Sequence, residues 1–168
     1  TDEKILQINF KYNDMTAEEY SQAVSARAEV IAAVDGLLWK VWIINEETQE
    51  AGGIYLFENE ASLNAYLGGP IVARVTSNPN RSDLDVKPFD VMVEPTTITR
   101  GPIGENLVVR KQTNEPKILQ INFKYNETVE EYSQAVSKGA EVIAGVDGLL
   151  WKVWIINEET QEAGGIYL

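Results

Sequence analysis

The chain begins with a segment in which apolar and polar residues alternate. In KILQINFKY (residues 4–12) every second side chain is apolar, which is the period of a β-strand with one buried face. Thr16 then comes three residues before Glu19, a capping box that predicts the start of a helix. Apolar residues recur at helical spacing as far as Asp35, and Gly36 after it predicts the end of that helix.

A β-hairpin is predicted next, from residues 37–44 and 52–57 around the polar turn NEETQE. Asn59 can cap a short helix, Gly68-Gly69-Pro70 ends it, and a polar loop around NPNRSD leads to a last strand over residues 86–94. This order, strand, helix, strand, strand, helix, strand, is that of the ferredoxin-like βαββαβ unit, an α+β antiparallel sheet with helices on one face.

The hairpin carries apolar residues on both of its faces, so the face opposite the helices also needs a cover. We expect it to pack on a second sheet, which would form a dimeric α+β barrel. The alternative is a single ferredoxin-like domain that leaves a modest apolar patch exposed to solvent.

Much of this pattern occurs twice. Residues 4–13 return letter for letter at 117–126, and LLWKVWIINEETQEAGGIYL occupies both 37–56 and 149–168. The period is too long and the copies too few for a solenoid, so the sequence indicates a partial duplication, of recombined or engineered origin. We expect a complete ferredoxin-like domain over residues 1–96, a linker over 97–116 and a truncated βαββ copy over 117–168.

The second copy has no counterpart of the second helix or of the last strand. In a ferredoxin-like sheet that last strand lies beside the first, so the strand over residues 117–125 is predicted to have an unpaired edge. Residues 57–95 could complete either copy. The other copy would then fray, pair with a candidate linker strand at Leu107–Val109, or be completed by another chain through domain swapping. We favour completion by a neighbouring molecule.

Composition narrows the classes of function. The 168 residues include 26 acidic and 14 basic ones, and the net charge of −12 argues against nucleic acids and membrane surfaces as partners. No apolar run approaches the ~20 residues that span a bilayer, and we expect a cytoplasmic protein. The chain has no His and no Cys, which excludes disulfides, thiol nucleophiles and Ser-His-Asp triads and removes the usual transition-metal ligands.

Two predicted strands carry side chains that could contact a ligand. On the first, the amides Gln7 and Asn9 lie opposite the apolar face and would either point into the barrel or hydrogen-bond across a dimer interface. On the second, Lys40 and Trp42 share one face and Trp39 belongs to the other, wholly apolar face, which we expect to pack on the helices.

Lys40 is the best candidate for a cation that binds a phenolate or, where desolvated, has a lowered pKa. The alternative is a lysine whose stem covers apolar surface while its amine reaches water. Trp42 could stack on an aromatic ligand, with Trp39 in its place if a bulge exchanges the faces, although both are also typical core residues. Tyr55 could donate a hydrogen bond to an oxyanion or simply pack, and Arg74 could close the mouth of a pocket.

The segments GLLWKVW, EAGGIYLF and KPFDVMVEP, in this order and at this spacing, resemble the YdhR family of proposed mono-oxygenases, which are dimeric α+β barrels related to antibiotic-biosynthesis mono-oxygenases. The resemblance covers residues 4–96 and then the first half again. It implies a homodimer and oxygenation of a small aromatic, phenol-like compound without any cofactor. In that scheme the substrate anion itself reduces dioxygen, and the protein supplies a dry pocket and oxyanion donors. The family has a His in the first strand, where this chain has Asn9 and Asn122.

Three functions therefore stay open at the level of sequence. The first is an oxygenase that acts on a small aromatic compound, with Lys40, Tyr55 and Asn9 as catalytic candidates and Gln7, Trp42, Trp39 and Arg74 as binding candidates. The second is a barrel that binds a small molecule without catalysis, for which the Asn at position 9 is the relevant feature. The third is a recombined or engineered duplication of mainly structural interest.

Overall fold

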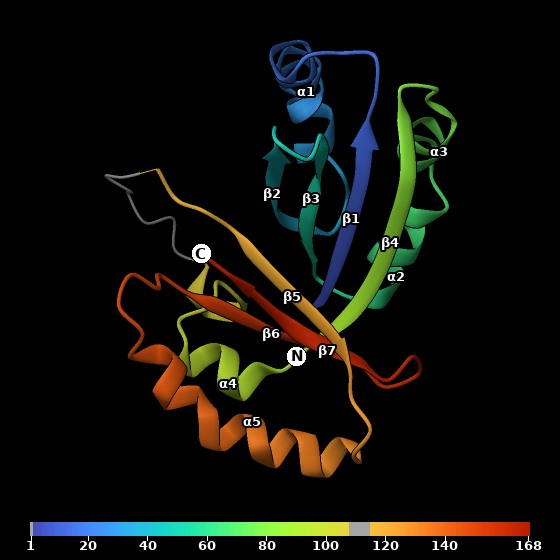
Figure 1. Cartoon of the computed structure of the whole chain (residues 1–168). Coiled ribbons are helices and arrows are strands. Elements are labelled where there is room, and N and C mark those ends of the chain that lie inside the picture. The colour runs from blue at the N-terminus through green and yellow to red at the C-terminus, as the bar shows by residue number, and fades with distance from the viewer. Residues whose placement is uncertain (1, 108–114) are drawn as a thin grey trace. The chain divides into compact units, whose positions relative to one another are not determined.

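The computed structural model describes residues 2–107 and 115–168 (Figure 1). Val108 and Val109 of the candidate linker strand lie outside the described residues. Internal contacts divide the chain into two compact units, Asp2–Pro88 and Phe89–Leu168, called here the N-terminal and the C-terminal unit. In the described part of the chain, no helix has both the length and the apolar character needed to cross a bilayer.

The fold is α+β, and its elements alternate as the sequence pattern predicts. In chain order they are β1 (Lys4–Tyr12), α1 (Ala17–Ala32), β2 (Leu37–Asn45), β3 (Glu50–Phe57), α2 (Glu60–Leu67), α3 (Pro70–Ser77), β4 (Arg81–Val91), α4 (Val93–Ile98), a 3₁₀ turn (Gly104–Asn106), β5 (Leu119–Lys124), α5 (Val129–Ala144), β6 (Lys152–Asn157) and β7 (Glu162–Tyr167).

The N-terminal unit has the ferredoxin-like strand order β2-β3-β1-β4, so the predicted sheet is confirmed. β3 lies between β1 and β2 and is antiparallel to both. Leu6 and Lys40 both stand opposite Tyr55, and side chains directly opposite one another point to the same face of a sheet. This register therefore places Lys40 on the face that carries the apolar residues of β1.

The caps of the long helices agree with the sequence. The Thr16 hydroxyl accepts a hydrogen bond from the backbone N–H of Glu19 at 3.1 Å and begins α1. In α5 the box is complete, because Thr128 accepts from the Glu131 N–H while the Glu131 carboxylate accepts from the Thr128 N–H, each at 3.1 Å. The deletion of one residue before Thr128 therefore leaves this helix start intact.

Two elements around residue 80 differ from the prediction. Residues 70–77, expected to begin a loop, form α3, because a proline in the first turn supports a new helix as readily as it ends the previous one. The last strand begins at Arg81 rather than Val86. Its polar start is held against the end of β1, where the Asn13 N–H donates to Asn80 O at 2.7 Å and the Asn13 amide donates to Ser82 Oγ at 2.9 Å. The strand also ends at Val91, before the predicted Glu94.

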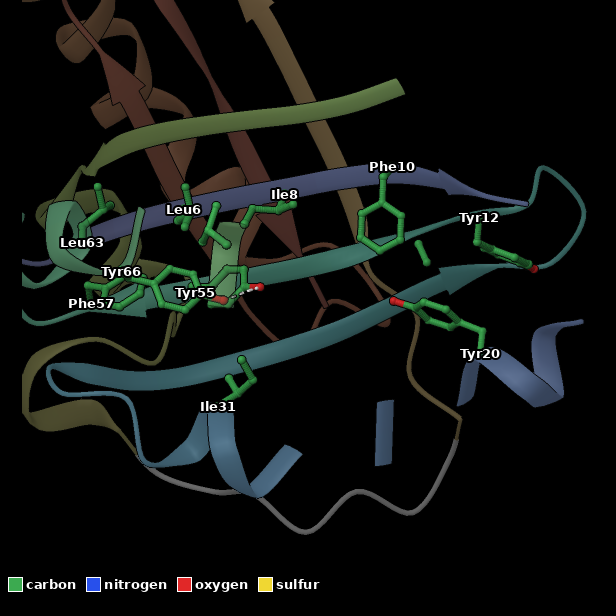
Figure 2. Packing of buried hydrophobic residues seen from close by; sticks show 12 residues of the cluster. Leu6, Ile8, Phe10, Tyr12, Tyr20, Ile31, Tyr55, Phe57, Leu63 and Tyr66 are labelled. Atoms are coloured by element: carbon green, nitrogen blue, oxygen red, sulfur yellow. Dashed lines mark hydrogen bonds between the residues drawn. The ribbon is translucent and has the colours of Figure 1, made fainter. Parts of the chain in front are cut away.

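The core of the N-terminal unit lies between the sheet and its helices. Figure 2 shows side chains of β1 and β3 directed toward Tyr20 and Ile31 of α1 and toward Leu63 and Tyr66 of α2. Aromatic rings dominate it: Tyr12 stacks on Tyr20 with ring centroids 5.3 Å apart. Such pairs add to the free energy gained from burying apolar area.

The C-terminal unit repeats part of this arrangement with a different neighbour for its sheet. Its strand order is β6-β7-β5, and the last residues of β4, Asp90 and Val91, pair with β6. Residues just after β4 form α4, which contains the buried Thr96 and is followed by the buried Thr99 at its C-cap. The Thr99 hydroxyl donates to Lys152 O at 2.7 Å and accepts from the indole N–H of Trp154 at 3.1 Å. Segment 92–99 is thus fixed to β6.

The strand β5 stands at the end of the strand order, as predicted for the first strand of the second copy. Its apolar residues Leu119, Ile121 and Phe123 are 54%, 41% and 44% exposed, whereas Leu6, Ile8 and Phe10, their counterparts in β1, are buried. Identical sequences therefore lie in a covered strand in one unit and in an exposed strand in the other.

Candidate functional site

The site is built on the β2–β3 hairpin. Lys40 faces Tyr55 and Trp42 faces Gly53 across this pair of strands. The Lys40 amine lies over both rings, with Nζ 3.2 Å from the centroid of the Trp42 ring and 4.5 Å from that of Tyr55. An ammonium group over an aromatic face is attracted by the ring quadrupole, which holds the amine at this place.

The two glycines of AGGIYLF make this arrangement possible. A Cβ added at Gly53 would overlap Cε of Lys40, so the missing side chain is the space in which the lysine stem lies. A Cβ at Gly52 would overlap the carbonyl oxygen of Ile8, so this glycine permits the close approach of β1 and β3. Gly53 thus makes room for the lysine stem, and Gly52 allows the two strands to approach closely.

A cavity of about 90 Å³ adjoins the Lys40 amine. It lies between α1 and the helix-covered face of the sheet, with α2, α3 and the start of β4 contributing further walls. The side chains that the following argument uses are Phe10, Arg27, Lys40, Trp42, Tyr55, Arg74 and Arg81, all in the N-terminal unit. At roughly 10–15 Å³ for each water, the cavity has room for about six to nine water molecules, which is about the space that one substituted aromatic ring needs.

Burial and neighbouring charges perturb the titrating groups of this pocket. Burial, followed by the positive charges of Arg81 and Arg27, lowers the pKa of Lys40 from 10.5 to about 7. Burial, followed by the neighbouring Tyr66, raises the pKa of Tyr55 above its usual 10, so this phenol stays protonated. The hydroxyl of Tyr66 donates to that of Tyr55 at 3.2 Å, the dashed line in Figure 2.

The structure brings four of the predicted site residues together, since Lys40, Trp42, Tyr55 and Arg74 all line the cavity. The face assigned to the second strand was wrong. We expected the face with Trp39 to pack on the helices, but it is Trp42 that packs against the core cluster containing Tyr20 and Ile31. The sheet face with Lys40 can pack on the helices because aromatic rings enclose the lysine, which makes a charged residue acceptable on the inner face.

The other three candidates lie elsewhere. Gln7 and Asn9 alternate with the pocket residues Ile8 and Phe10 along β1, and Trp39 alternates with Lys40 along β2, so all three belong to the opposite face of the sheet. Gln7 is buried there. Their role as ligand contacts stays a prediction for that face.

Sequence reasoning missed the two arginines that perturb Lys40. Arg27 belongs to α1 and Arg81 to the first position of β4, and Cζ of Arg81 lies 4.6 Å from the centroid of the Phe10 ring. The only sequence signal was a difference between the copies, because Gly139 stands at the position equivalent to Arg27.

The C-terminal unit contains the same lysine–aromatic cluster. Nζ of Lys152 lies 3.2 Å from the centroid of the Trp154 ring and 4.4 Å from that of Tyr167. A Cβ at Gly165 would overlap Cε of Lys152, as at Gly53 in the first copy. Burial lowers the pKa of Lys152 to about 8, and no guanidinium contributes. For Lys40 burial is again the largest cause, and the positive charges of Arg81 and Arg27 lower the pKa further.

Metal-binding chemistry has no visible basis in the described residues, because no three Asp or Glu side chains come together there. The cavity lining offers one amine, three guanidinium groups, three phenols and one indole. This set can bind an aromatic ring, an anion, or a proton from an acidic hydroxyl group.

The sequence of the chain matches a known protein family. The model of the family described as "Putative mono-oxygenase ydhR" matches residues 5–102 and again residues 118–168, and the chain therefore belongs to this family. The comparison with curated proteins gives no match.

Several solved structures are similar over about half of the chain. A putative antibiotic biosynthesis monooxygenase from Deinococcus radiodurans is 15% identical, with 52% of this chain and 90% of that one covered and a TM-score of 0.44. SnoaB, a cofactor-independent oxygenase from Streptomyces nogalater, is 14% identical over 55% and 95%, with a TM-score of 0.46. The heme-degrader MhuD from Mycobacterium tuberculosis is 17% identical over 54% and 97%, with a TM-score of 0.43.

Proposed function

We propose that the N-terminal unit is a mono-oxygenase that oxidises a small phenolic or quinol compound in the pocket beside Lys40, without any cofactor. The observation that carries this proposal is the position of the Lys40 amine, which lies over the Trp42 and Tyr55 rings at the edge of a cavity the size of one aromatic ring. Membership of the mono-oxygenase family supports it.

Lys40 acts as the base in this scheme. With a pKa of about 7, about half of the amine is neutral at pH 7 and can accept the proton of a phenol. The O–H bond breaks, Nζ becomes an ammonium group, and the phenolate stays beside that charge. The electron-rich phenolate then transfers electrons to dioxygen. One oxygen atom enters the ring and the other leaves as water, so that a phenol and O2 give a quinone and H2O with all electrons supplied by the substrate.

The phenols of Tyr55 and Tyr66 supply hydrogen-bond donors. Their hydroxyl groups are already paired at 3.2 Å, and the raised pKa of Tyr55 keeps its proton available for donation. A donor held in a largely apolar site stabilises negative charge on oxygen more strongly than water does. Phe10, Tyr20 and Ile31 line the cavity, and their apolar surface disfavours water beside the reacting ring.

Oxygen consumption tests the proposal directly. A panel of monocyclic phenols and hydroquinones is incubated with the protein in an oxygen electrode, with Lys40→Met as the variant and Lys152→Met as the matched control. We expect Lys40→Met to lower the rate roughly 10²- to 10⁴-fold, as for loss of a general base. The Lys152→Met control should leave it unchanged. No oxygen uptake above the buffer rate with compounds that bind would overturn the oxygenase assignment.

The rate should also depend on pH in a defined direction. Because neutral Lys40 is the active form, kcat/KM is expected to rise through pH 7 and then level off. The titrating and charged groups that surround this amine are Tyr20 and Arg27 on α1, Tyr66 on α2, Arg74 on α3, Arg81 on β4 and Tyr55 on β3. None of these tyrosines titrates near pH 7, so a change of kcat/KM near pH 7 is due to the titration of Lys40.

A second candidate function is binding of a small aromatic molecule without catalysis. The feature that favours it is the Asn at positions 9 and 122, where the resemblance to the family implies a His. In this case phenols would bind and oxygen would not be consumed. The same assay, run beside a binding measurement, separates the two functions.

We also propose that the sheet face opposite the helices pairs with a second sheet, as in a dimeric α+β barrel, and that the repeat over residues 117–168 is a truncated copy. The apolar residues Ile5, Ile54 and Leu56 on that face are fully buried, which supports a covered rather than a solvent-exposed face. Analytical ultracentrifugation tests this, because a strictly monomeric species at micromolar concentration would argue against a homodimer.

A further inference from the structure

The charges that line the pocket are all of one sign. Four elements contribute one cation each: Arg27 from α1, Lys40 from β2, Arg74 from α3 and Arg81 from β4. No Asp or Glu is among the lining residues, and the ion pairs found in the described residues do not involve these four. In a chain with a net charge of −12, this local excess of positive charge is unexpected.

An uncompensated guanidinium group beside an apolar cavity is energetically unfavourable. Arg81 is half-buried, lies over the Phe10 ring, and shares the pocket with another arginine whose charge adds to its own. Removing positive charges from water without a partner costs free energy that an anion would return. The planar guanidinium fork matches a carboxylate, which it binds through two parallel hydrogen bonds.

From this arrangement we infer that the pocket selects aromatic carboxylates, with the ring between Trp42 and Phe10 and the carboxylate held by Arg81 and Arg27. The inference deepens the proposed function and rests on it for the reaction, since it names the substrate class as single-ring hydroxybenzoates. The hydroxyl group of such a compound then faces Lys40, and its carboxylate faces the guanidinium end.

The shape of the cavity fits this class. About 90 Å³ accommodates one substituted ring, whereas two fused rings need more space. Arg27 and Arg74 are exposed while also lining the cavity, which places them at its mouth. A carboxylate at that end keeps contact with water on one side, so the ligand is not required to bury its charge completely.

The C-terminal unit offers a natural comparison for this inference. It keeps Lys152, Trp154 and Tyr167 in the same geometry, but Gly139 stands in place of Arg27. The pKa of Lys152 accordingly responds to burial alone. The lysine–aromatic cluster is thus common to both units, and the pair of guanidinium groups belongs to the N-terminal unit.

Binding measurements on the full chain test the inference. The probes are 4-hydroxybenzoate and its neutral isostere 4-hydroxybenzamide, titrated by isothermal calorimetry at low salt. The variants are Arg81→Gln and Arg27→Gln, with Lys11→Gln as the control. The Lys11→Gln substitution also removes one positive charge from the N-terminal unit, but at a residue that does not line the pocket. Circular dichroism confirms that each variant is folded.

We expect the wild-type protein to bind the carboxylate roughly ten- to a hundredfold more tightly than the amide, the effect of one charge-assisted pair. Arg81→Gln and Arg27→Gln should each reduce this preference at least severalfold, and Lys11→Gln should preserve it. Equal affinity for the two probes in the wild-type protein, or a preference that survives in the double arginine variant, would overturn the inference.

The two proposals fail in different ways. Preferential binding of 4-hydroxybenzoate without oxygen uptake keeps the carboxylate site and removes the oxygenase. Oxidation of neutral phenols without any preference for the carboxylate keeps the oxygenase and removes the carboxylate site.

Discussion

The duplication allows one substitution to be made twice, in two environments. Leu6 of β1 and Leu119 of β5 occupy the same position of the identical segment KILQINFKYN, yet Leu6 is fully buried and Leu119 is 54% exposed. Replacing each by alanine removes the same atoms. We expect Leu6→Ala to lower the free energy of unfolding of the N-terminal unit by about 2–5 kcal/mol, the range for buried leucines that leave a cavity.

The expected cost at Leu119 is much smaller. Leu→Ala removes the equivalent of about three methylene groups, each worth about 0.8 kcal/mol when fully buried. Roughly half of Leu119 is already in water, and no closed cavity remains after its truncation. We therefore expect about 1 kcal/mol or less from Leu119→Ala, and the contrast between the two variants is the quantity to measure.

Hydrogen exchange read by mass spectrometry in increasing urea gives this contrast for each unit separately. Peptides from the duplicated hairpin are identical, so the units are distinguished by helix peptides that contain Arg27 in α1 or Gly139 in α5. If Leu119→Ala destabilises the α5 peptides as much as Leu6→Ala destabilises the α1 peptides, Leu119 is covered in solution. The interpretation of β5 as an exposed strand would then be wrong.

Three further predictions follow from individual contacts. Lys40→Met should stabilise the protein below pH 7, and this gain in stability should shrink between pH 7 and pH 10.5. In that range Lys40 of the wild-type protein is protonated in the unfolded state and neutral in the folded state, so the wild-type protein becomes more stable as pH rises. Urea melts of both proteins across this pH range measure the difference. Gly53→Ala should shift the Lys40 amine with little loss of stability, whereas Gly52→Ala, which meets a backbone carbonyl, should destabilise strongly in the same melts. Thr99→Val leaves a buried indole N–H unpaired and should cost about 1–3 kcal/mol by thermal unfolding.

Much of the N-terminal unit could be predicted from local pattern. The alternation of apolar and polar residues predicted β1, the capping residue Thr16 predicted the start of α1, and the turn NEETQE predicted the hairpin. Each of these signals acts within a few residues, so it can be read from the sequence. The polar start of β4 could not be predicted in this way. It becomes a strand through hydrogen bonds from Asn13, a residue far away in sequence, and tertiary pairing outweighs the low β-propensity of its residues.

The candidate site shows the same limit. Lys40, Trp42 and Tyr55 could be found together because one hairpin presents all three. The face they occupy could not, since a lysine on an inner face is acceptable only when rings enclose its amine, and sequence alone does not show which rings do so. Arg27 and Arg81 were missed because they come from two elements far apart in sequence, and no local motif links the two residues.

The two copies separate what the hairpin determines from what the rest of the fold adds. Lys152, Trp154 and Tyr167 reproduce the geometry of the first copy to within about 0.1 Å in both amine–ring distances, 3.2 Å and 4.4 Å against 3.2 Å and 4.5 Å. The C-terminal unit does so without counterparts of α2, α3 or Arg27. The cluster is therefore a local property of two paired strands and a glycine. Selectivity for a ligand must come from the elements around that cluster, and in the N-terminal unit these are the helices and the strand that deliver the arginines.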